Sequence, residues 1–177
     1  PEDLKGRYYL EEASKCTDCH EDLQHGDIRN HNIHIGKVQC QVCHSQTYTN
    51  CYSCHTGTDP EGLPYYINQK DAEGMKIGLA YEADAPDADY NFMLVRHIPI
   101  DPKLFDAYEK NIFTGFDTIP TWERASPHNI QRKTWQAANC NHCHGNRELF
   151  LSVQDLLDYE VDANRPVVVS DIRVPAK

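Results

Sequence analysis

Four copies of a five-residue pattern carry most of the chemistry that this sequence can support. In each copy two cysteines stand three positions apart, and a histidine follows the second cysteine directly. Two thiols at this spacing can form thioethers with the two vinyl groups of one porphyrin, and the histidine can bind its iron as proximal ligand. The sequence therefore predicts four covalently bound haem c groups. The attachment cysteines are Cys16, Cys19, Cys40, Cys43, Cys51, Cys54, Cys140 and Cys143, and the proximal histidines are His20, His44, His55 and His144.

Paired cysteines also occur in zinc sites and in disulfide frameworks. Neither use requires a histidine after every second cysteine. With 10 histidines in 177 residues, chance would place one at all four positions with odds on the order of 10⁻⁵. All eight cysteines fall within the four motifs, so the pattern favours haem over both alternatives.

Six histidines remain as candidate distal ligands, which exceeds the four that six-coordinate irons need. We predict that His31, His34, His97 and His128 bind iron, and we keep His25 and His142 as alternatives. The i, i+3 spacing of the first two, shortly before the second motif, lets two imidazoles face two neighbouring porphyrins. His142 lies inside the fourth attachment loop, so it cannot easily reach its own iron but can reach that of a neighbour.

Only two methionines are present, and both stand in strand-like patterns, so we interpret Met75 and Met93 as packing residues. The sequence thus predicts bis-histidine ligation throughout, which favours low reduction potentials compared with His/Met haems.

The composition argues against an ordinary hydrophobic core, because the mean hydropathy is -0.68 and the formal charge is -10. Four porphyrins would supply large apolar faces, so we expect a haem-cored fold. The acidic charge disfavours nucleic acid and anionic membrane surfaces as partners. No stretch of the sequence approaches the ~20 apolar residues that span a bilayer, so we expect no membrane span.

We expect a mostly irregular fold with short helices and a small β-hairpin, arranged as a single tetrahaem domain over residues 1–177. Its parts would be residues 1–58 with haems 1–3, a His- and Cys-free hairpin insertion at 59–95, residues 96–150 with distal ligands and haem 4, and a C-terminal extension at 151–177.

Local patterns predict the individual elements. Residues 63–67 and 75–81 alternate in polarity and would form the hairpin around a turn at 71–74. Helices are expected from Asp101 through residue 108, and from residue 131 to the fourth motif, where Gly145 would end the helix. Ser152 would cap a further short helix. The three valines at 167–169 would form a strand whose exposed edge could pair with another chain.

These features resemble the multihaem c-type cytochromes, and within them the small extracellular tetrahaem cytochromes that polymerise into filaments. The resemblance lies in His31-Asn-Ile-His34 ahead of Cys40-Gln-Val-Cys43-His44, the closely following Cys51-Tyr-Ser-Cys54-His55, Arg96-His97-Ile-Pro-Ile, and Ser126-Pro127-His128-Asn129 ahead of Cys140. It implies alternating stacked and T-shaped haem pairs, and a histidine of one subunit that can ligate a haem of the next. It also carries over the same four distal ligands.

The resemblance implies electron transfer along closely packed haems, in a secreted, extracellular filament subunit that meets redox partner proteins or extracellular acceptors. Two alternatives stay open: a soluble periplasmic shuttle, and a haem reductase with one open iron. We expect no enzyme, because the sequence contains no hydrolase or metalloprotease motif and no free cysteine.

Overall fold

The computed structural model describes residues 15–171 apart from 25–26, 47–50, 72–73, 82–89, 99, 101, 104, 107, 113, 126 and 128. The chain divides into two compact units, Pro1–Ile35 and Gly36–Lys177. The division falls between the first and the second cysteine motif. The predicted turn at 71–74 lies partly outside the described residues.

The described residues of the first unit form short helical segments. Two 3-10 helices span Cys16–Asp18 and Glu21–Gln24, and α1 spans Arg29–His34. The side chain of Asp18 accepts a hydrogen bond from the backbone N–H of Lys15 at 2.8 Å, which caps the first of these helices. Such short helices match the predicted fold class.

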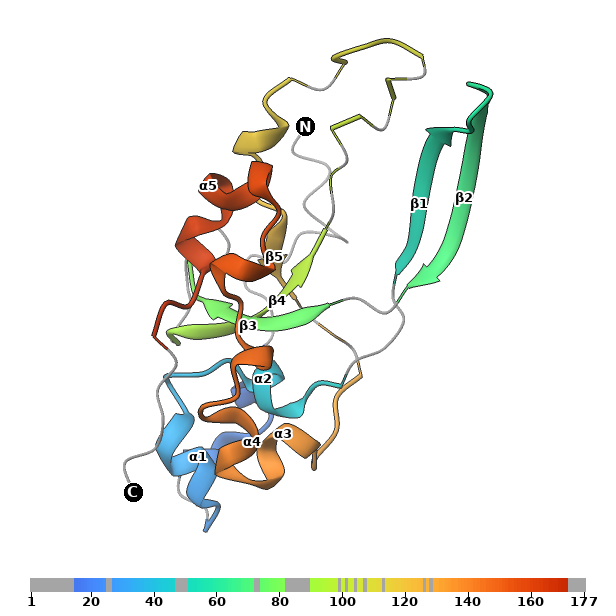
Figure 1. Ribbon diagram of the computed structural model, residues 1–177. Coiled ribbons are helices and arrows are strands. Elements are labelled where there is room, and N and C mark those ends of the chain that lie inside the picture. The colour runs from blue at the N-terminus through green and yellow to red at the C-terminus, as the bar shows by residue number, and fades with distance from the viewer. Residues whose placement is uncertain are drawn as a thin grey trace, which may run out of the picture. The chain divides into compact units, whose positions relative to one another are not determined.

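The second unit contains two antiparallel sheets (Figure 1). Strands β1 (Cys51–Thr58) and β2 (Pro64–Asp71) form a hairpin in which Cys51 faces Asp71. Strands β3 (Met75–Leu79), β4 (Phe92–His97) and β5 (Trp122–Arg124) form a three-stranded sheet in the order β3-β4-β5.

The predicted hairpin was wrong in its pairing, although both of its segments are strands. Residues 63–67 fall largely within β2, which pairs with β1, and residues 75–81 fall largely within β3, which pairs with β4. Alternating polarity indicates an extended segment with one buried side, but it does not identify the partner strand. β4 offers β3 a matching buried pair, since Ile77 lies opposite Leu94 and both are 6% exposed.

Side chains on both faces of the three-stranded sheet are buried. Met93 and Val95 of β4 join Trp122, Leu151 and Val167 in one apolar cluster. The intervening Leu94 joins Val42, Ile77 and Ala125 in a second cluster, against which Met75 packs. Alternate residues of a strand face opposite sides, so β4 contributes to both clusters. The packing role predicted for the two methionines is therefore confirmed.

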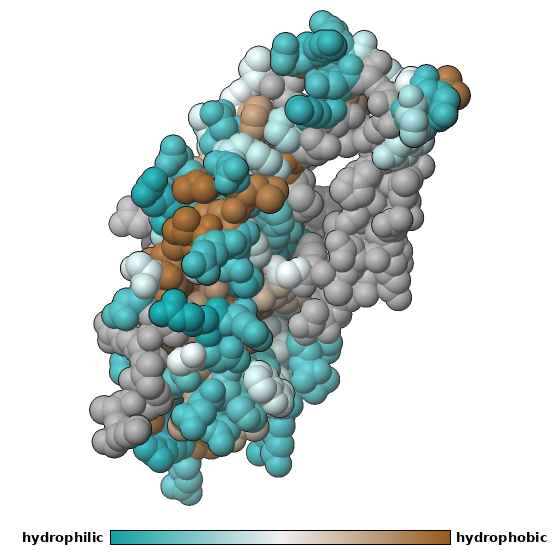
Figure 2. Space-filling model, viewed as in Figure 1, coloured by the Kyte–Doolittle hydropathy of each residue, from teal (hydrophilic) through white to brown (hydrophobic). Residues whose placement is uncertain are grey.

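The C-terminal segment covers one face of this sheet with a series of single helical turns (Figure 1). It comprises 3-10 helices at Val153–Asp155, Asp158–Glu160 and Arg165–Val167, with α5 at Val161–Asn164. Ser152 occupies the predicted cap position, and Oδ2 of Asp155 accepts from both its N–H and its hydroxyl at 2.8 Å. Figure 2 shows a hydrophobic area over this segment, where Val153 and Leu157 are 56% and 46% exposed.

The predicted exposed strand at the three valines is wrong. Val167 ends a 3-10 helix and is 2% exposed, and Val169 is 4% exposed with its N–H bonded to the carbonyl of Leu151. The valine side chains pack against the sheet of the same chain, so this segment does not form an exposed edge strand.

The helix expected from residue 131 is also interrupted. Two short helices, α3 (Trp135–Ala138) and α4 (Cys140–Cys143), are separated by Asn139, whose backbone is extended. Gly145 ends the region with φ 79°, as predicted, because glycine adopts this left-handed conformation without strain. The described residues of the helix expected from Asp101 form turns instead. Two further 3-10 helices lie at Phe116–Thr118 and Arg147–Leu149.

Candidate haem attachment sites

The first motif lies in the first unit, on and just after the 3-10 helix Cys16–Asp18. Both of its cysteines and His20 are exposed. His31 and His34 stand on α1 in the same unit, and the Nδ1 atom of His34 donates to the carbonyl of Asn30 at 2.9 Å. The candidate attachment residues of the first motif therefore lie at the surface of this unit, where a cofactor could reach them.

The second motif forms α2, which spans Cys40–His44. Gln39 anchors the start of this helix to β4, because its N–H donates to the carbonyl of Phe92 at 2.8 Å and its Oε1 accepts from the N–H of Leu94 at 2.8 Å. Val42 is 5% exposed and packs into the second apolar cluster. The helix is thus fixed on the sheet, with its two cysteines one turn apart.

His44 has the hydrogen bond expected of an axial haem ligand. Its Nδ1 donates to the carbonyl of Gln131 at 3.0 Å, across 87 positions of sequence. An axial histidine ordinarily gives its Nδ1–H to a carbonyl or carboxylate, which orients the ring and assigns Nε2 to the metal. The contact therefore fits His44 as a proximal ligand.

The fourth motif forms α4 and the residue after it. The side chain of Asn139 accepts from the N–H of Asn141 at 3.0 Å and caps the helix. Cys140 is exposed, whereas Cys143 is partly buried and packs against the second apolar cluster, to which Val42 of the second motif belongs. The second and fourth motifs thus meet at one apolar cluster.

The thiols of these two motifs are close enough to influence each other. Burial, followed by the nearby Cys143 and Cys40 sulfurs, raises the pKa of the Cys43 thiol to about 11. Burial also raises the pKa of Cys143. Desolvation and like charge both disfavour the thiolate, so the thiols of Cys43 and Cys143 are protonated at neutral pH.

The third motif lies on β1, where the backbone of His55 pairs with that of Ile67. The side chains of Cys51, Cys54 and His55 lie outside the described residues. His25 and His128 lie outside them as well.

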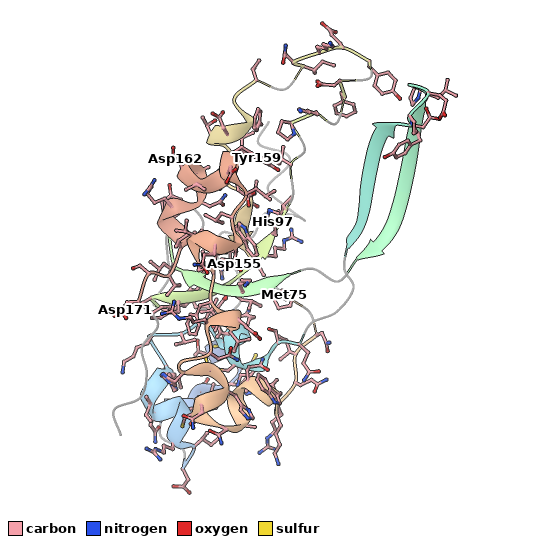
Figure 3. All side chains as sticks on the ribbon, viewed as in Figure 1. Met75, His97, Asp155, Tyr159, Asp162 and Asp171 are labelled. Carbon is pink, nitrogen blue, oxygen red and sulfur yellow. The ribbon has the colours of Figure 1, made fainter. Side chains whose placement is uncertain are left out.

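His97 lies at the end of β4 (Figure 3), where a partly buried polar network holds its ring. Its Nε2 lies 3.0 Å from Oε2 of Glu160, and its ring stacks on that of Trp122 with centroids 4.9 Å apart. Glu160 is 1% exposed and also accepts from the Thr121 hydroxyl at 2.5 Å and from the N–H of Leu157 at 2.9 Å.

Burial raises the pKa of Glu160, but the hydrogen bonds from Thr121, Leu157 and His97 outweigh it and leave that pKa below its usual value. Glu160 is therefore an ionised carboxylate bonded to Nε2 of a candidate haem ligand. A carboxylate in this place orients a metal-binding histidine, but it leaves Nδ1 of His97, and not Nε2 as in His44, as the nitrogen available to iron. Sequence reasoning missed Glu160, because a glutamate in an acidic C-terminal segment carries no local signal of burial.

His142 is oriented in the same way as His44. The Nδ1 atom of His142 donates to the carbonyl of Trp135 at 2.7 Å. The imidazole ring stacks on the indole ring of Trp135, with centroids 4.2 Å apart and an interplanar angle of 7°. The structure thus gives this alternative ligand a fixed ring with Nδ1 engaged.

Two buried donors fit the acceptor groups that a haem would bring. Among the described residues, Nε2 of Gln39 and Nε1 of Trp122 have no hydrogen-bond partner, although these residues are 3% and 4% exposed. The Gln39 amide cannot be reversed, because its oxygen accepts from Leu94. Buried donors require acceptors, and haem propionates are carboxylate acceptors. The donors present are therefore compatible with haem.

No cluster of three His, Cys, Asp or Glu side chains suited to a bare metal ion occurs in the described part of the chain. None of the helices described there is long and apolar enough to cross a membrane. No protein-family model, no curated protein and no solved structure matches this chain.

Proposed function

We propose that this protein is an electron carrier that holds four haem c groups. The four Cys-x-x-Cys-His motifs carry this proposal, and the Nδ1 contact of His44 supports it. A bound haem supplies one-electron chemistry at iron. The chain's own residues attach each porphyrin through two sulfurs, provide imidazole ligands, and set the dielectric and hydrogen bonding that tune each potential.

In the proposed ligand set, His20, His44, His55 and His144 are proximal, and His31, His34, His97 and His128 are distal. Glu160 beside His97 is suited to hold that ring and to increase its basicity, which stabilises the oxidised iron. Bis-histidine ligation leaves no iron position open, so electron transfer is favoured over reductase chemistry.

We further propose that the protein acts outside the cell as the repeating subunit of a cytochrome filament, on the basis of its resemblance to tetrahaem filament cytochromes. The alternative is a soluble periplasmic shuttle. The burial of Val167 and Val169 favours this alternative, because it removes the exposed C-terminal edge that would have supported strand pairing between subunits.

Three measurements on the secreted protein test these proposals. Intact-mass spectrometry should show four haem additions, and any smaller number would overturn the tetrahaem proposal. Electron microscopy at neutral pH should show thin uniform filaments, whereas monodisperse particles would establish the shuttle. Carbon monoxide should leave the spectrum of the reduced protein unchanged, and prompt binding at one haem in four would contradict a pure carrier.

A further inference from the structure

The carbonyl groups at the end of α2 are bonded to a distant part of the chain. The last carbonyls of a helix have no partner within it and must be satisfied from elsewhere. Here Gln136 donates to the carbonyls of Val42, at 3.4 Å, and Ser45, at 2.8 Å. The hydroxyl of Thr134 donates to the carbonyl of Cys43.

Two backbone contacts continue this connection along the same stretch. The N–H of Gln131 donates to the carbonyl of His44 at 2.7 Å, and the Nδ1 of His44 donates to the carbonyl of Gln131. The N–H of Gln46 donates to the carbonyl of Asn129 at 3.0 Å, beside a bridge between Ser45 and Ile130. Residues 129–136 therefore run along the C-terminal end of the second motif.

The same stretch leads directly into the fourth motif. Residue 136 belongs to α3, which ends two residues before Cys140 begins α4. Thr134 is 6% exposed, so its bond to Cys43 is formed away from water and is costly to leave unmade. Cys143 then packs against the apolar cluster that contains Val42.

From these contacts we propose that the haems of the second and fourth motifs are direct neighbours, and that residues 129–136 fix their spacing. Electrons would pass between these two haems although about 100 residues separate their motifs. In the sequence the third motif is much nearer to the second, since Cys51 follows Cys40 by 11 positions. This inference rests on the proposed function, since it requires that both motifs carry haem.

The test uses a reciprocal pair of ligand variants in the holoprotein. A methionine ligand raises a haem's potential relative to histidine, so in His144→Met the fourth-motif haem becomes reduced before the others. The second-motif haem then titrates beside a reduced neighbour. His44→Met gives the reverse situation. Each redox titration is monitored by NMR of the haem methyl groups. The haem whose ligand has been replaced is identified by the change in its own signals.

If the haems are neighbours, at least one of the two variants changes the reduction equilibrium constant of the other motif's haem by about threefold or more, as expected for charges close together in a protein interior. An unchanged constant in both variants would overturn the proposal. Mass analysis of peptides from the wild-type protein comes first, and absence of haem at these two motifs would refute the proposed function. Haems that are attached but uncoupled would refute only the pairing.

A second pair of variants tests the role of residues 129–136. Gln136→Met removes two hydrogen bonds to the end of α2 while keeping side-chain length. Gln154→Met is the matched control, because Gln154 is exposed. The first variant should weaken the coupling between the two haems, and the control should preserve it. Equal coupling in both would show that residue 136 does not fix the spacing. If Gln136→Met fails to fold, the ligand variants still decide the main proposal.

Discussion

Asn164 offers the sharpest test of how the C-terminal segment is held against the sheet. It is fully buried, and its Oδ1 accepts from the N–H groups of Thr121 at 3.0 Å and Trp122 at 2.8 Å. Its Nδ2 donates to the Thr121 hydroxyl and to the carbonyl of Glu160, both at 2.8 Å. One side chain thus joins the start of β5 to the turn that places Glu160 beside His97.

Asn164→Ala would leave two buried N–H groups without acceptors. Each such group costs about 1–3 kcal/mol, so we expect a loss of about 4 kcal/mol in the free energy of unfolding. For a chain of this size each kcal/mol lowers Tm by about 2–4 °C, which gives a decrease of about 8–16 °C. The assay is thermal unfolding of the purified holoprotein followed by circular dichroism.

Asn91→Ala is the matched control, because Asn91 is exposed and only its backbone contributes hydrogen bonds. We expect a change within about 0.5 kcal/mol for this variant. A decrease in Tm below about 3 °C for Asn164→Ala, or an equal effect of both variants, would refute the view that this network holds the C-terminal segment on the sheet.

Three further outcomes are expected. Hydrogen bonds from Lys76 and Ser152 outweigh burial and lower the pKa of Asp155 below 3.8. The ionised carboxylate therefore stabilises the fold above that pH, and this stabilisation is lost as the pH falls through the lowered pKa. Denaturant titrations between about pH 2 and 5 should show a shallower pH dependence of the unfolding free energy for Asp155→Asn than for the wild type. Gly78→Ala should lower the unfolding free energy by about 1–3 kcal/mol in the same assay, because a Cβ there would lie 3.0 Å from both a backbone oxygen and a valine methyl group, and an unchanged midpoint would contradict this close approach. The double variant Cys140→Ala and Cys143→Ala should lose one haem by intact mass, and retention of four would refute attachment at the fourth motif.

Local patterns predicted two extended segments, but they did not predict the strand partners. The extended character of residues 75–81 follows from alternating polarity. Its pairing with β4 places the buried side chains of Ile77 and Leu94 opposite each other. Other segments of alternating polarity could have supplied a similar buried residue. The buried valines at 167–169 show the same limit, since hydrophobic β-branched residues suit an exposed edge strand and a core equally well.

The break at Asn139 shows how tertiary contacts override a helical pattern. A continuous helix would satisfy the local preferences of residues 131–144. In the structure this stretch instead supplies side chains and backbone groups to the end of α2, while Asn139 restarts the helix as an N-cap. Contacts across about 90 residues, which no local pattern records, outweigh local propensity here.

By itself, the sequence carries the proposed covalent chemistry of this protein, in its eight cysteines and the four histidines that follow them, because thioether formation and proximal ligation would depend on spacing within five residues. Only the tertiary structure decided which motifs adjoin, that Glu160 faces His97, and that the C-terminal valines are buried. Those arrangements depend on contacts between residues far apart in the chain, and such contacts form only when both segments are held on the same sheet.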